Sequence, residues 1–115
     1  MHDRARQLLT QLVNAPESLS RNRHFSLFEE PRAKNLRRRA AHLRTIRDAL
    51  LQGSAMLDRA KIDAQRTMLR LRYDTGTIQR IWLSNAEAKI LKAALWPEAT
   101  DALRTELECW AFHEA

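Results

Sequence analysis

The longest regular pattern in the sequence lies between Pro31 and Gly53, and it predicts a single basic helix. Apolar residues recur there at steps of three and four, which places them on one stripe of an α-helix. The stripe consists of Ala33, Leu36, Ala40, Leu43 and Leu50. Pro31 suits the first helical position, and Gly53 suits the left-handed turn that ends a helix. The sequence therefore predicts a helix over residues 31–52.

Basic residues surround this apolar stripe: Arg32, Lys34, Arg37, Arg38, Arg39, Arg44 and Arg47. At about 100° per residue they wrap the helix and form no single ridge. Arg37 and Arg44 flank one side of the stripe, and Arg38 lies opposite it. Three interpretations follow: a solvated helix whose arginine stems cover the edge of the core, a surface that contacts phosphates, or a surface for an acidic protein partner.

Residues 66–83 contain two alternating runs that flank Asp74-Thr75-Gly76, a pattern that predicts a β-hairpin. If Gly76 is the left-handed residue of a three-residue loop, Tyr73 opposes Thr77. One face then carries Leu69, Leu71, Tyr73, Ile81 and Leu83, and the other carries Met68, Arg70, Arg72, Ile78, Arg80 and Trp82. A two-residue loop would scatter the apolar set, so the hydrophobic pattern favours the first register.

The second face of this hairpin combines arginines with a tryptophan. Arg70, Arg72 and Arg80 around an exposed Trp82 suit a surface that binds nucleic acid. Two structural interpretations stand beside it: Trp82 packs under the arginine stems in an intramolecular cation–π contact, or a helix covers both.

The segments before and after the basic helix are less regular. Residues 1–15 predict an amphipathic helix that Pro16 stops, and residues 16–30 predict irregular structure with a short helix near Pro16. After Gly53, Ser54 could cap the second helix of a helix-turn-helix, or the chain could form a loop or short helical turn that leads into a strand.

Two C-terminal helices are expected over residues 85–113. Ser84 and Glu87 form the pattern of a capping box. Trp96-Pro97 interrupts the helix, because the residue before a proline avoids the helical region, and a last helix follows over about 98–113. Its apolar end, with Trp110 and Phe112, belongs either to the core or to an oligomer contact.

A second basic–aromatic cluster precedes the long helix, where Arg21 and Arg23 stand near Phe25. Such a cluster can hold a nucleic acid, with arginines on phosphates and the ring on a base. Alternatively, the phenylalanine fills the core below a loop. Together with Trp110 and Phe112, these residues are expected as a possible interaction surface.

The sequence lacks the residue patterns of several classes of protein. A single cysteine, Cys109, permits no internal disulfide, and the four histidines are scattered, so no metal site is expected. No phosphate loop, zinc-protease motif or nucleophile elbow occurs, so we expect neither an enzyme nor a cofactor. No apolar run reaches membrane-spanning length and the N-terminus carries charges, so a cytoplasmic protein without a membrane partner is expected.

The charge of the chain indicates polyanionic partners. The formal net charge is +6 and the isoelectric point is about 10.4. The charge is uneven, because residues 60–83 hold five basic and two acidic residues whereas residues 84–115 hold three and six. The acidic C-terminal part could pair with the basic helix in the same molecule or in a second copy.

These observations predict an α+β fold: a mainly helical single domain over residues 1–115, with four to five helices and one β-hairpin at about 66–83. The order of helix, helix, hairpin and helix resembles winged-helix DNA-binding domains. That resemblance implies that the basic helix and the Arg70–Arg80 hairpin contact DNA.

The functional expectation is a nucleic-acid-binding regulator or accessory subunit. It would contact DNA or RNA phosphates through Arg37, Arg38, Arg44, Arg70, Arg72 and Arg80, with Trp82 stacking or wedging. The alternative is a protein-interaction module, such as an adaptor, an inhibitor or an antitoxin-like partner, that binds an acidic protein or a second copy.

Overall fold

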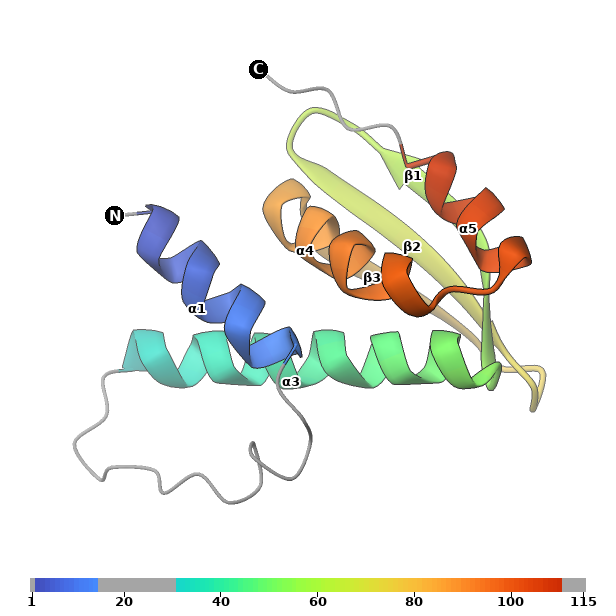
Figure 1. Ribbon diagram of the computed structural model, residues 1–115, viewed down its shortest axis with the longest axis horizontal. Helices are drawn as coiled ribbons and strands as arrows, with labels where there is room; N and C mark the ends of the chain where they lie inside the picture. Colours follow the sequence, from blue (N-terminus) through green and yellow to red (C-terminus); the bar gives the residue numbers. More distant parts are fainter. Residues whose placement is uncertain (1, 15–30, 111–115) are drawn as a thin grey trace. The chain divides into compact units, whose positions relative to one another are not determined.

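The computed structural model describes residues 2–14 and 31–110, which form a small α+β fold (Figure 1). The chain divides into two compact units, Met1–Thr45 and Ile46–Ala115, and the division falls inside the long helix α3 (Pro31–Gln52). The expectation of a single domain over residues 1–115 stays a prediction, and the short helix expected near Pro16 lies outside the described residues.

The first unit contains helix α1 (His2–Asn14) and most of α3. Helix α1 buries Leu9, Leu12 and Val13 on one face, as the spacing of its apolar residues requires. Helix α3 has the bounds that its apolar stripe predicts, and within this unit it buries Ala40 and Leu43. None of the described helices is both long enough and apolar enough to cross a membrane.

The second unit contains a three-stranded antiparallel sheet in the order β1 (Ala55–Ile62), β2 (Arg66–Tyr73), β3 (Ile78–Ser84). The predicted hairpin register is confirmed: Arg72 pairs with Ile78, and the amide of Tyr73 donates to the carbonyl of Thr77 at 2.8 Å. Gly76 has φ +91°, the left-handed conformation that the three-residue loop requires. One hairpin was expected, and the sheet has a third strand.

Strand β1 replaces the second helix that a helix-turn-helix would need, so that alternative is wrong, and the resemblance to winged-helix domains ends here. Gly53, at φ +81°, ends helix α3, and β1 follows within two residues. Its pairing with β2 shifts between Leu57 and Arg59, which marks a bulge at Asp58. The inward residues are therefore Ala55, Leu57, Ala60 and Ile62. The step of three residues between Leu57 and Ala60 breaks the two-residue period by which a strand is recognised in a sequence.

Helix α4 (Asn85–Leu95) packs on β2 and β3 and covers one face of the sheet. The predicted capping box is present, because the amide of Glu87 donates to Ser84 Oγ at 3.1 Å and the amide of Ser84 donates to Glu87 Oε1 at 2.9 Å. Asn85 joins this helix start to the sheet. Its Oδ1 accepts from the buried Thr67 hydroxyl at 2.7 Å, and its Nδ2 donates to the carbonyl of Asp63 at 2.9 Å.

The last helix, α5 (Asp101–Glu108), is shorter than the expected 98–113. A 3₁₀ turn, Trp96–Glu98, comes first, and α5 begins after Thr100, whose hydroxyl accepts from the amide of Leu103 at 3.2 Å. A threonine oxygen can cap a helix, whereas Pro97 offers no such group, so the cap sets the start. Trp110 is fully buried and belongs to the core. Phe112 lies outside the described residues.

Candidate nucleic-acid interface

The face of the sheet that α4 leaves uncovered gathers basic side chains from all three strands, and we call it the open sheet face. The strand pairing places on it Met56, Arg59 and Lys61 from β1, Arg66, Met68, Arg70 and Arg72 from β2, and Ile78, Arg80 and Trp82 from β3. Of these side chains Met68 is buried, and the others are exposed or partly exposed. The opposite face carries the buried residues Leu57, Thr67, Leu69, Leu71, Ile81 and Leu83. The predicted division of the hairpin into an apolar and a basic face is therefore observed.

Three arginines lie directly opposite one another across the sheet. Arg59 pairs with Arg70, and Arg70 pairs with Arg80, so one residue from each strand forms a line that we call the arginine row. Neighbouring strands lie about 4.8 Å apart, and like charges directly opposite each other destabilise a sheet. The row therefore concentrates positive charge at some cost to the stability of the fold.

Asp58 partly neutralises the centre of this row. The bulge places its carboxylate on the open sheet face, where Oδ2 accepts from Arg70 Nε at 2.7 Å and Oδ1 lies 3.6 Å from Arg72 Nη2. Among the described residues of the three strands, Asp58 is the one acidic side chain facing this way. It fixes the two central arginines, while Arg59 and Arg80 on the outer strands stay exposed.

Trp82 lies beside the arginine row on the outer strand β3 and is 49% exposed. The guanidinium of Arg66 stacks over its ring, 4.2 Å from the ring centroid. An intramolecular cation–π contact is therefore present, but its partner is Arg66 and not one of the three arginines expected from the sequence. The ring nevertheless keeps about half of its surface in solvent, so the intramolecular contact and a role in binding are compatible.

The arginines of helix α3 are displayed unequally. Arg38 is exposed and Arg37 is partly exposed, whereas only 6% of Arg44 is exposed. Arg44 was expected to contact phosphates, but its side chain is withdrawn from solvent. Arg47 is engaged by Asp48 at 2.8 Å. The cluster of Arg21, Arg23 and Phe25 lies outside the described residues.

The sequence alone did not identify Arg59, Lys61 or Arg66 as residues of the interface. The first two lie on β1, whose alternation the bulge interrupts, and the third lies at the start of β2. The available signal was the set Ala55, Leu57, Ala60 and Ile62, which alternates once an extra residue is allowed at Asp58.

The turn between β1 and β2 is held by Asp63. Its Oδ1 accepts from the amides of Arg66 at 3.2 Å and Gln65 at 3.4 Å. These hydrogen bonds hold the pKa of the Asp63 carboxyl below its ordinary value of 3.8, because they stabilise the ionised form. The turn sets the start of β2 and hence the position of Arg66.

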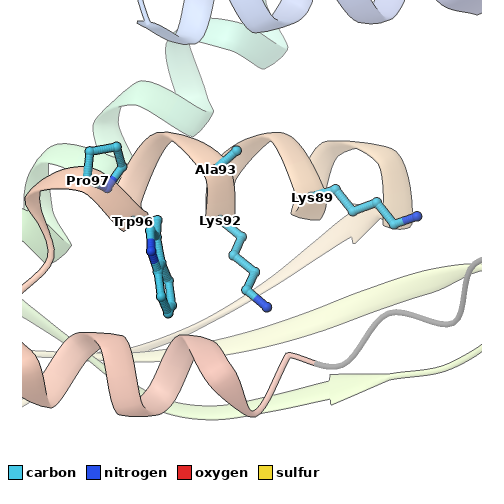
Figure 2. A pocket seen from close by; sticks show the side chains of 5 residues that line it. All are labelled: Lys89, Lys92, Ala93, Trp96 and Pro97. Atoms are coloured by element: carbon cyan, nitrogen blue, oxygen red, sulfur yellow. The ribbon is translucent and has the colours of Figure 1, made fainter.

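Hollows also occur among the described residues on the helical side of the second unit. One of them has a volume of about 400 Å³. Lys89, Lys92, Ala93, Trp96 and Pro97 line it (Figure 2). Its polar groups are engaged in the fold, since Lys92 Nζ donates to the carbonyl of Trp110 at 3.0 Å and the guanidinium of Arg104 lies 5.7 Å from the Trp96 ring centroid. The described residues contain no group of three histidine, cysteine or acidic side chains that could hold a metal ion.

A second hollow, of about 340 Å³, lies between the end of α3, the start of β1 and helix α5. Leu50, Leu57 and Leu103 contribute apolar surface to it, and Met56, which is 69% exposed, lies at its edge. It suits an apolar side chain better than a charged ligand.

A comparison of the chain with protein-family models, with characterised proteins and with solved structures finds no significant match.

Proposed function

We propose that this chain is a non-enzymatic nucleic-acid-binding protein, a regulator or accessory subunit, that contacts phosphates through the open sheet face. The observation that carries the proposal is the arginine row. Arg59, Arg70 and Arg80 meet across three strands, and Asp58 is the one acidic neighbour on the described strands. A protein without a polyanionic partner gains nothing from this arrangement, because like charges opposite each other oppose folding.

Arginine is the residue type best suited to this role. Its planar guanidinium donates paired hydrogen bonds to phosphate oxygens, and it remains charged at any physiological pH. Lys61, Arg66 and Arg72 surround the row and are exposed, so they extend the positive surface toward both ends of the strands. Phosphate contacts of this kind give affinity that falls steeply with salt.

Helix α3 supports the proposal to a smaller extent. Arg38 is exposed and stays among the proposed contacts, together with Arg37, which is partly exposed. Arg44 is left out because it is buried.

A second candidate function is binding to an acidic protein. The hollow beside Met56 favours it, because an apolar side chain of a partner could enter there while acidic residues meet Arg72. Such an interface keeps an apolar contribution that salt does not screen, whereas a phosphate interface loses most of its affinity.

The test is binding of a labelled single strand and a labelled duplex of mixed sequence across a salt series. With about four or five phosphate contacts, affinity for the single strand should fall about 50- to 130-fold between roughly 50 and 200 mM salt. The variant Arg59→Gln/Arg80→Gln should bind more weakly and show a slope smaller by about 1.4. The control Arg4→Gln/Arg6→Gln removes the same charge from exposed positions of α1.

Absence of binding to either probe at low salt would contradict the proposal. Equal losses in the two charge-matched variants would also contradict it, because they would show that total charge matters and the open sheet face does not.

A further inference from the structure

We infer that the ligand of the open sheet face is a single-stranded nucleic acid whose backbone crosses the three strands along the arginine row and places one unpaired base on Trp82. This inference rests on the proposed function and names its substrate class. It follows from the positions of Trp82 and the row relative to each other.

The ring and the row are adjacent on one strand. Trp82 and Arg80 are two residues apart on β3 and point to the same side, which separates them by about 7 Å. Arg80 ends the row at the outer strand, so a phosphate held there brings its attached base toward the Trp82 ring. The row itself runs perpendicular to the strands, and this direction sets the path of the backbone.

The Trp82 side chain is 49% exposed, and a base can stack on an aromatic ring only when the base is unpaired and unstacked. The Arg66 guanidinium, 4.2 Å from the ring centroid, holds the indole in place and adds a second planar group on which bases stack. In an intact duplex the faces of the bases are covered by their neighbours, so Trp82 would have no ligand.

The width of the charged surface also disfavours a duplex. The row spans two strand spacings, about 10 Å between the outer backbones, and arginine side chains extend from each. The major groove is about 12 Å wide and admits a helix or a two-stranded ribbon. A three-stranded face with charged residues on both outer strands is broader, and a flexible single strand can follow it.

The experiment compares four probes: a thymidine oligonucleotide of about ten residues, a uridine oligonucleotide, an abasic oligonucleotide of the same length, and a duplex of mixed sequence. The thymidine or uridine strand should bind at least about tenfold more tightly than the abasic strand and the duplex. The preferred sugar then identifies DNA or RNA as the source of the strand.

Trp82→Ala should weaken binding of the preferred strand by about 10- to 100-fold and leave the abasic strand nearly unchanged, while Trp82→Phe should retain most of the affinity. The matched control is Trp96→Ala. Trp96 is 38% exposed and also lies under an arginine, Arg104, but it is on the helical side. Far-ultraviolet circular dichroism confirms that each variant is folded.

The outcomes separate the two proposals. The inference is overturned if the abasic strand and the duplex bind as tightly as the thymidine strand and Trp82→Ala does not change the affinity. The open sheet face then remains a phosphate-binding surface. If Trp82→Ala does not fold, the comparison of thymidine and abasic strands on the wild-type protein still decides. No binding of any probe at low salt overturns the inference together with the proposed function.

Discussion

Replacing Arg59 and Arg80 by glutamine is expected to stabilise the fold and to weaken nucleic-acid binding. Both side chains are exposed, and both lie opposite Arg70 in the arginine row. The double variant removes both like-charge pairs of the row and keeps most of each aliphatic stem. Because Arg70 retains its 2.7 Å contact with Asp58, the centre of the row then has a balanced pair.

The magnitude follows from the cross-strand pairs. Each directly opposed like-charge pair costs about 0.2–1 kcal/mol, and the charge of Asp58 offsets part of this. The free energy of unfolding should therefore rise by about 0.5–1 kcal/mol at low salt, which corresponds to a rise in Tm of about 2–6 °C for a chain of this size. High salt screens exposed charges, so the gain should shrink there.

The assay is thermal unfolding followed by circular dichroism at low and high salt, on wild type, on the double variant and on the Arg4→Gln/Arg6→Gln control. A rise in Tm that is confined to the row variant and fades with salt supports the reasoning. A fall in Tm, or an equal rise in the control, would refute it, because the opposed arginines would then carry no specific cost.

Three further predictions follow from the same structure. Asp58→Asn should lower the free energy of unfolding by about 1–2 kcal/mol, because Arg70 loses a charged partner. The same variant should bind an oligonucleotide several-fold more tightly. Denaturant unfolding and binding titrations measure the two effects, and weaker binding would contradict the role given to Asp58. Gly76→Ala should cost about 1 kcal/mol through its φ of +91° alone, because nothing lies within 4 Å of the added carbon; a neutral effect in urea unfolding would contradict this. The folded-state pKa of the Asp63 carboxyl is lowered, so this group contributes stability above pH 3.8 that is lost as the pH falls further. In Asp63→Asn the free energy of unfolding should therefore depend less on pH below about pH 4. A titration of the Asp63 carboxyl by NMR with a midpoint above 3.8 would contradict this prediction.

Much of the fold could be predicted because local patterns and tertiary structure agree. The stripe of α3, the capping box at Ser84 and the register of the hairpin all rest on interactions within a few residues or on a strict two-residue period. Gly76 fixed the loop length, and the loop length fixed which face Trp82 occupies.

The remaining features depended on irregularities. The bulge at Asp58 shifted the phase of β1, so a strand was not distinguished from a helix or loop, and Arg59 and Lys61 were missed with it. The arginine row exists only through pairing between β1 and β2, which no local pattern records. The burial of Arg44 likewise depends on what packs around helix α3, and the spacing of residues in one helix does not contain that information.

The most direct test of the central claim is an NMR titration of the 13.4 kDa protein with the oligonucleotide it prefers, at low salt, followed on backbone amides and on the indole signal of Trp82. The account predicts that the largest shifts fall on the strands around Arg59, Arg70, Arg80 and Trp82 and that α4 and α5 change little. Shifts concentrated on α1 or on the helical side of the second unit, or no shifts at all, would contradict it.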